Sequence, residues 1–139
     1  MLTVPVKKGI NKKISQIEIS YQIPWQKKLL KTISQRYAKE KFFEKVFLEF
    51  ACIINSSPVY LSDLNKNLLL WAVERLKIPT RIEVSSELNV RGKSTEKLIN
   101  LCHSVNGTKY FSGQGGKAYL DVKKFESQNI ELEYSDFSS

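Results

Sequence analysis

The sequence predicts an α/β fold with a small, mostly parallel sheet, and three observations support this prediction. Residues 80–139 alternate three short β-favouring runs with two segments of helical spacing. Apolar stripes at helical spacing come before them, and two short strand-like segments come first of all. Strands that alternate with helices are typical of parallel sheets. We therefore expect a βαβαβ C-terminal half, preceded by a helical hairpin and two short N-terminal strands.

The first part of the chain predicts two strands, at residues 2–6 and 16–20, around a basic turn. In the second of these, apolar residues alternate with polar ones, which is typical of a strand with one buried face. A helix follows, because four apolar residues recur at every fourth position: Trp25, Leu29, Ile33 and Tyr37.

The most apolar stripe of the chain lies at residues 42–54 and predicts a second helix. Aromatic stripes at helical spacing are usually core, and we interpret this one as core. A third helix is expected from Ser62, its N-cap, to residue 78. Pro79 would end it, because the residue before a proline disfavours helical backbone.

The second half of the chain predicts the remaining elements in strict alternation. Strands are expected at 81–85, 108–112 and 130–134, with helices at 95–105 and 117–128. Ser94 is expected to cap the first of these helices, and Asn106-Gly107 to close it.

Composition limits the class of protein. The chain has 139 residues, of which 42% are hydrophobic and 11% aromatic, so disorder is excluded and a single domain over 1–139 is expected. No apolar run is long enough for a membrane span, and no export signal is recognised, so we expect a cytoplasmic protein. Cys52 and Cys102 fall in helical patterns and are interpreted as small buried hydrophobes rather than disulfide or zinc ligands.

The net charge of +8 is concentrated at the front of the chain. Residues 1–50 contain eleven of the 22 basic residues and four of the 14 acids. Such an excess attracts phosphates, and Lys7, Lys8 and Lys28 are the candidates for steering an anion. A solvated helix face explains the same lysines equally well.

Two turns are the candidate binding segments, because ligands of open parallel sheets bind beyond the carboxyl ends of the strands. One contains Ser85, Ser86 and Glu87, directly after an expected strand. The other runs from Ser112 to Lys117 and contains Gly113, Gly115 and Gly116, which allow a ligand to approach the backbone closely. Its length and its missing hydroxyl exclude a Walker A loop.

Catalytic chemistry has only weak candidates. Glu87 and Asp121 are acids near the expected binding edge, and surface solvation explains both equally well. His103, the single histidine, lies late in a helix, where a cation is favoured for structural reasons. We therefore expect no metal site, and no cofactor is implied.

Several strings, taken in order, resemble the WbqC-like family of bacterial proteins. They are Leu2-Thr3-Val4-Pro5-Val6-Lys7, Trp25-Gln26-Lys27-Lys28, Leu64-Asn65, Ser85-Ser86-Glu87-Leu88, Gly92-Lys93-Ser94-Thr95-Glu96-Lys97-Leu98-Ile99 and Tyr110-Phe111-Ser112-Gly113-Gln114-Gly115-Gly116-Lys117-Ala118-Tyr119-Leu120-Asp121. The most specific of these is Ser-Gly-x-Gly-Gly-x-x-Tyr-Leu-Asp. The family is associated with surface-polysaccharide and O-antigen biosynthesis. The resemblance therefore implies group transfer on a nucleotide-activated sugar or a related anionic substrate, with Tyr119 and Asp121 shaping the site.

The chain departs from the family pattern at its ends. The strand and the Gln-Pro-x-Tyr-x-Pro-Trp-like loop with which members begin are missing, and the chain stops soon after Phe137. We therefore expect a partial domain that self-associates or needs a companion segment. A truncated, non-catalytic remnant is the main alternative. A nucleic-acid-binding module is less favoured, because the basic front half has a single arginine and its aromatics lie on core stripes.

Overall fold

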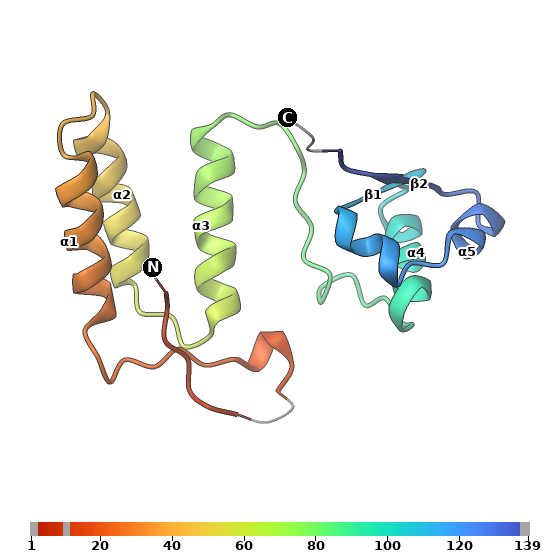
Figure 1. Cartoon of the computed structure of the whole chain (residues 1–139), viewed down its shortest axis with the longest axis horizontal. Coiled ribbons are helices and arrows are strands. Elements are labelled where there is room, and N and C mark those ends of the chain that lie inside the picture. The colour runs from red at the N-terminus through yellow and green to blue at the C-terminus, as the bar shows by residue number, and fades with distance from the viewer. Residues whose placement is uncertain (1–2, 10–11, 137–139) are drawn as a thin grey trace. The chain divides into compact units, whose positions relative to one another are not determined.

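The computed structural model describes residues 3–9 and 12–136, which form two compact units (Figure 1). Unit 1 is Met1–Pro79 and unit 2 is Thr80–Ser139. Each unit has its own hydrophobic core. The single domain expected over 1–139 stays a prediction.

Within its described residues, unit 1 is built from three helices, which the sequence predicted, and a short 3₁₀ segment (Figure 1). They are η1 Ile14–Gln16, α1 Trp25–Tyr37, α2 Phe43–Asn55 and α3 Leu61–Arg75. Its core consists of Ile19, Trp25, Ile54 and Leu64, which are at most 5% exposed. The apolar spacing of the helices therefore correctly predicted where they form.

Both ends of α3 differ from the prediction. The helix begins at Leu61 and not after a capping Ser62, because its first N–H group is already satisfied by the segment before α1. The Leu61 N–H donates to the Ile17 carbonyl at 2.9 Å. At the other end, the helix stops at Arg75, and Lys77 takes a left-handed φ of 52°. The Ile78 N–H then donates to the Val73 carbonyl at 3.0 Å. This hydrogen bond closes the helix, so Pro79 is not what ends it.

The two N-terminal strands were predicted wrongly for the residues that the structure describes. Instead of strands there are two isolated antiparallel bridges, Val6↔Ile19 and Glu18↔Tyr60, and η1 takes part of the second segment. Residue 2, the first of the expected strand, lies outside the described residues. Pro5 lacks an N–H group, which shortens the ladder that the first segment can form.

Unit 2 contains a two-stranded parallel sheet with helices (Figure 1). Its elements are α4 Ser94–Ser104, β1 Lys109–Ser112, η2 Gln114–Ala118, α5 Val122–Ser127 and β2 Glu131–Tyr134. The strands pair in register from Lys109↔Glu131 to Ser112↔Tyr134. The parallel direction and the second and third strands agree with the prediction. The core is formed by Ile99, Cys102, Leu120, Phe125 and Ile130.

The first strand expected in unit 2, at 81–85, is not formed, so the βαβαβ prediction was wrong there. Residues 80–93 are irregular, and only Ile82 and Val84 of the expected strand are half-buried. A turn begins at once, in which the Glu87 N–H donates to the Val84 carbonyl at 2.8 Å. No described strand pairs with these residues, so they do not form a strand.

The helix expected at 117–128 is divided into η2 and α5. Asp121 ends the continuity, because its Oδ1 accepts from the Lys124 N–H at 3.3 Å and begins a new helix. Ser94 is the first residue of α4, with a φ of 49° and no capping hydrogen bond, so its predicted cap role was wrong. The closure at Asn106-Gly107 is confirmed: Asn106 has a φ of 55°, and the Gly107 N–H donates to the Cys102 carbonyl at 2.7 Å.

Candidate functional site

The carboxyl ends of β1 and β2 meet at one edge of the sheet in unit 2. The Ser135 N–H donates to the Ser112 carbonyl at 2.8 Å, directly after the last strand pair. The Gln114 side-chain amide donates to the Ser135 carbonyl, which joins the glycine turn to the end of β2. We call this group, Ser112, residues 113–117, Tyr134 and Ser135, the strand-end site.

Two buried hydroxyl groups lie in the strand-end site. Ser112 is 6% exposed, and its Oγ donates to the Gly113 carbonyl at 3.1 Å. Ser135 is 3% exposed, and its Oγ has no hydrogen-bond partner in the described part of the chain. A buried hydroxyl without a partner destabilises a protein, so the Ser135 Oγ is an unsatisfied polar group within the strand-end site.

The three glycines of the turn have different surroundings. Gly116 is buried, and a Cβ there would overlap the Ser112 hydroxyl and lie 2.9 Å from a methyl group of Leu120. Gly116 is therefore required for packing. Gly113 and Gly115 are exposed, and a Cβ at either would meet nothing within 4 Å. These two positions leave bare backbone open to a ligand.

Lys117 supplies positive charge at this edge. Its Nζ lies 5.4 Å from the centroid of the Tyr134 ring, and no carboxylate among the described residues is within ion-pair distance of it. At the opposite end of β1, Lys109 is paired with Glu133 at 2.7 Å and Glu131 at 3.1 Å, which raises its pKa. Of these two lysines, Lys117 at the carboxyl edge is the one without a carboxylate partner among the described residues.

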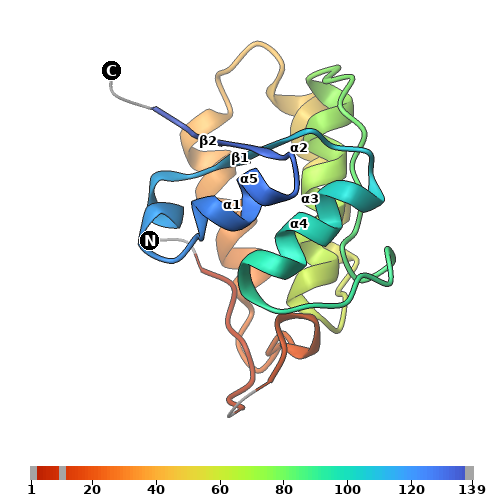
Figure 2. The ribbon, with the colours of Figure 1, turned by 90° about the vertical axis from the view of Figure 1, so that its right-hand side faces the viewer.

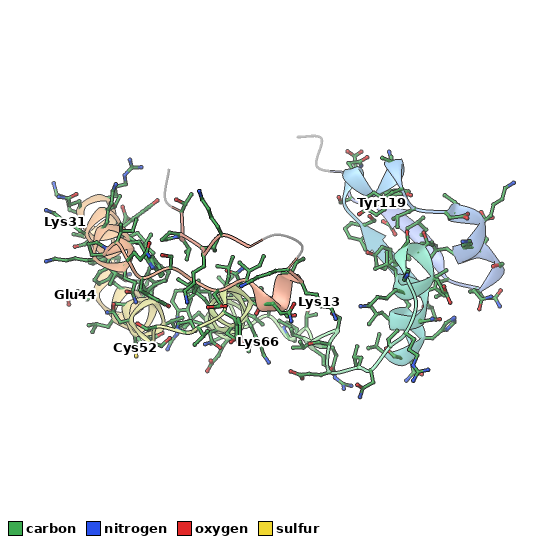
Figure 3. The ribbon with its side chains drawn as sticks, turned by 90° about the horizontal axis from the view of Figure 1, so that it is seen from below. Lys13, Lys31, Glu44, Cys52, Lys66 and Tyr119 are labelled. Carbon is green, nitrogen blue, oxygen red and sulfur yellow. The ribbon has the colours of Figure 1, made fainter. Side chains whose placement is uncertain are left out.

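The candidate acids do not form an acid–base pair at this edge. Asp121 caps α5 through its Oδ1, while its N–H donates to the Thr95 hydroxyl at 3.2 Å. Glu87 lies in the turn after Val84, and His103 is exposed at the end of α4. Tyr119, labelled in Figure 3, is 66% exposed. Of the candidate acids, Asp121 has a structural role, because it caps α5.

The second predicted turn does not lie beside the first. Figure 2 shows the irregular segment that contains Ser85 and Ser86 (green) and η2 (blue) on opposite sides of unit 2. The structure therefore does not bring the two turns together, and the binding roles of Ser85, Ser86 and Glu87 stay predictions.

The lysines that were expected to steer an anion belong to unit 1. Lys7, Lys8 and Lys28 are all exposed. The Lys7 ammonium donates to Glu18 at 2.7 Å, and Lys12 donates to the other oxygen of that carboxylate at 3.2 Å. These hydrogen bonds lower the pKa of Glu18. Part of the positive charge of Lys7 is therefore neutralised locally.

Sequence reasoning missed a groove in unit 1. The groove has a volume of about 620 Å³. We call it the aromatic groove; it is lined by Ile33, Tyr37, Glu40, Lys41, Phe42, Phe43, Val46, Phe47, Phe50 and Trp71. The core interpretation of the 42–54 stripe was wrong for Phe42 and Val46, which are 68% and 40% exposed. Phe42 precedes α2 as its N-cap residue, so it is not part of the apolar face of that helix.

Cysteine and metal chemistry add little to the candidate site. Cys102 is buried, as expected, and burial raises the pKa of its thiol. Cys52 is exposed on α2, so its interpretation as a buried residue was wrong. Within residues 3–9 and 12–136, no three His, Cys, Asp or Glu side chains come together as a metal site.

None of the described helices is long and apolar enough to cross a membrane.

Comparison with known proteins decides the family. The profile of the WbqC-like protein family matches residues 1–139, the whole of the sequence. The chain belongs to the WbqC-like family. It is also similar to the uncharacterized protein Rv1507c of Mycobacterium tuberculosis, with 30% identity over 139 residues. That match includes 98% of this chain and 60% of the mycobacterial protein, so this WbqC-like chain spans less than two thirds of its relative. No solved structure matches the chain.

Proposed function

We propose that unit 2 binds the phosphate part of an anionic substrate such as a nucleotide-activated sugar, and that the protein takes part in group transfer in surface-polysaccharide biosynthesis. The observation on which this depends is the strand-end site. There the unpartnered Ser135 hydroxyl, the unpaired Lys117 and the bare backbone at Gly113 and Gly115 occur together. Membership of the WbqC-like family supports the same class of substrate.

The chemistry of the strand-end site suits a phosphate better than a neutral sugar. Phosphate oxygens accept hydrogen bonds from hydroxyl and backbone N–H groups, and they attract an ammonium group. No protein atom lies within 4 Å of the position that a Cβ would take at Gly113 or Gly115. A ligand can therefore approach the backbone there without displacing a side chain. The sugar would then extend toward the exposed Tyr119.

Binding without catalysis is a second candidate function. The observation that favours it is the role of Asp121 as the cap of α5, which engages the acid closest in sequence to the glycine turn at residues 113–117. In that case the protein would hold the activated sugar without transferring it. Incubation with UDP-glucose and a sugar acceptor, followed by chromatography of the nucleotide, separates the two candidates, because only an enzyme transfers glucose to the acceptor hydroxyl and releases UDP.

Calorimetric titration with UDP-glucose, UDP and uridine tests the binding proposal. The two diphosphates should bind and uridine should not, since uridine has no phosphate. Lys117→Gln should weaken UDP binding on the order of tenfold through loss of one charge-assisted contact. The control Lys123→Gln removes another exposed lysine, from α5, and should leave the Kd unchanged.

Gly115→Ala gives a sharper test. The added methyl group meets no protein atom within 4 Å, so the unfolding temperature should not change, whereas a bound phosphate at the turn would be displaced. Equal affinity for UDP and uridine, or unchanged UDP binding in both Lys117→Gln and Gly115→Ala, would refute the proposed site.

A further inference from the structure

The aromatic groove of unit 1 is a preformed surface whose rings are held by specific contacts. The Trp71 Nε1 donates to Glu49 Oε2 at 2.9 Å, and Arg75 pairs with the same carboxylate. Trp71 also contacts the Phe50 ring at 5.9 Å between centroids. Since the polar edge of Trp71 is satisfied by Glu49, its ring contributes an apolar wall to the groove.

The second wall comes from the first turns of α2. Phe43 and Phe47 stack with centroids 4.7 Å apart, and Val46 lies between them in sequence with 40% of its surface exposed. Ile33 and Tyr37 of α1 line the groove as well. An apolar cavity of about 620 Å³ falls in the usual range of small-molecule sites, roughly 300–1,000 Å³.

Residues 36–45, which include the connection between α1 and α2, have a net positive charge, although the groove lining contains one residue of each sign. Only two lining residues are charged, Glu40 and Lys41, and both belong to the connection between α1 and α2. The Lys41 Nζ lies 5.3 Å from the centroid of the Phe42 ring, and no described carboxylate pairs with it. The charged residues of this stretch are Arg36, Lys39, Lys41 and Lys45 against Glu40 and Glu44. An apolar groove bordered by a segment of net positive charge complements a molecule with a hydrocarbon chain and an anionic head.

We propose that the aromatic groove binds a single-chain amphiphilic anion, a hydrocarbon chain that ends in a carboxylate. The chain lies among the rings of Phe43, Phe47 and Trp71, and the carboxylate pairs with Lys41. This site is separate from the strand-end site and does not depend on the function proposed for unit 2. Water solvates exposed aromatic rings poorly, and a hydrocarbon chain would cover them. The carboxylate would give Lys41 the ion pair that it lacks among the described residues.

Titration of the full chain with dodecanoate tests the proposal, with dodecan-1-ol and dodecylammonium as matched probes below their aggregation concentrations. Dodecanoate should bind about tenfold more tightly than the alcohol, because one charge-assisted contact is added, and more tightly still than the ammonium. Trp71 lines the groove, so binding should change the tryptophan fluorescence.

Two pairs of variants locate the ligand. Lys41→Glu should weaken dodecanoate binding at least tenfold and leave dodecan-1-ol binding unchanged. Its control is Lys31→Glu, an exposed lysine of α1 that projects outward in Figure 3 and does not line the groove. Val46→Phe should fill the groove and abolish binding of both probes, whereas Leu48→Phe, at a 70% exposed position of α2 outside the lining, should not.

Circular dichroism confirms that each variant folds, and Phe42→Ala provides a further loss-of-contact variant at a side chain that is 68% exposed. Equal affinity for the carboxylate and the alcohol would overturn the proposal. So would unchanged binding in both Val46→Phe and Phe42→Ala, or binding to phospholipid vesicles without binding to monomeric dodecanoate. A dimer that Val46→Phe dissociates would assign the groove to a second copy instead.

Discussion

The two cysteines differ in exposure, although their sequence patterns are alike. Cys52 lies on the exposed side of α2, while Cys102 belongs to the core of unit 2, where burial raises the pKa of its thiol. A disulfide reagent reacts with the thiolate form of a cysteine. The burial of Cys102 and the raised pKa of its thiol therefore both slow its reaction.

We therefore expect one fast and one slow reacting thiol in the native protein. Stopped-flow measurement with a chromogenic disulfide reagent should show a single rapid equivalent, which Cys52→Ser removes. The second equivalent should appear only in denaturant. Two equally rapid equivalents in the native protein would contradict the burial of Cys102.

Glu18 should make the stability of unit 1 depend on pH at the acidic side. Hydrogen bonds from Lys7, and then from Lys12, lower the pKa of Glu18 in the folded state below its usual value. Its stabilising contribution is therefore complete above the unfolded-state pKa and is lost as the pH falls through the folded-state pKa.

Thermal unfolding of Glu18→Gln from neutral to acidic pH measures this contribution. The variant should lose less stability than the wild type over that interval. Glu44→Gln, which removes an exposed carboxylate that has no ion pair in the described chain, is the control. Because the Glu18 pairs are solvent-exposed, we expect a small effect.

Sequence reasoning succeeded at residues whose role is set by their immediate neighbours. Asn106-Gly107 closes α4 as predicted, because a left-handed residue followed by glycine satisfies the last carbonyls of a helix locally. Ser62 and Ser94 failed as caps. The N-terminus of α3 is satisfied by Ile17, far away in the sequence, and no local pattern contains that contact.

At the scale of elements, the cap of α5 is the feature that the sequence did not reveal. Asp121 divides the expected helix in two and ties α5 to α4 through its N–H and the Thr95 hydroxyl. The first of the two resulting segments, η2, contains most of the glycine turn. Its Gly116 packs on Ser112.

Asp121→Ala should destabilise unit 2 by roughly 0.5–2 kcal/mol, the usual loss when a capping carboxylate is removed. Chemical unfolding followed by far-ultraviolet circular dichroism measures the loss, and Asp121→Asn should restore most of it because the amide oxygen can accept the same hydrogen bond. If Asp121→Ala and Asp121→Asn were equally destabilised, the charge rather than the cap would be responsible.

Helices were predicted better than strands for a physical reason. Apolar spacing in α1 and α2 is a property of the segment itself, whereas a strand needs a partner. β1 and β2 find each other, but residues 81–85 have no strand partner among the described residues and remain irregular. For the same reason the predicted convergence of two turns at one edge depended on a strand that does not form.

At the scale of the whole molecule, the chain has two separate cores. The core around Leu64 lies entirely in unit 1 and the core around Phe125 entirely in unit 2, and both of these side chains are fully buried. Trp25 and Trp71, the two tryptophans of the chain, both belong to unit 1. Tryptophan fluorescence therefore reports the unfolding of unit 1 alone.

Leu64→Ala should lower the stability measured by tryptophan fluorescence by about 2–5 kcal/mol, the cost of a large cavity. Phe125→Ala should leave that transition in place while the circular dichroism signal of unit 2 is lost at lower denaturant concentration. A fluorescence transition that shifts equally in both variants would show that the units unfold cooperatively.

Sedimentation of the wild type at rising concentration tests the expected self-association, which stays a prediction.

The sheet of unit 2 has only two strands in the described chain, so neither strand has neighbours on both sides. Half of the main-chain amide and carbonyl groups of each strand point outward, and these must find water or other partners. What keeps β1 and β2 adjacent is therefore the covering of one face, where Tyr110 stacks on Phe125 with centroids 5.4 Å apart. Without α4 and α5, which supply the core beneath them, the two strands would lose the packing that holds them and the end of the sheet at which Lys117 lies.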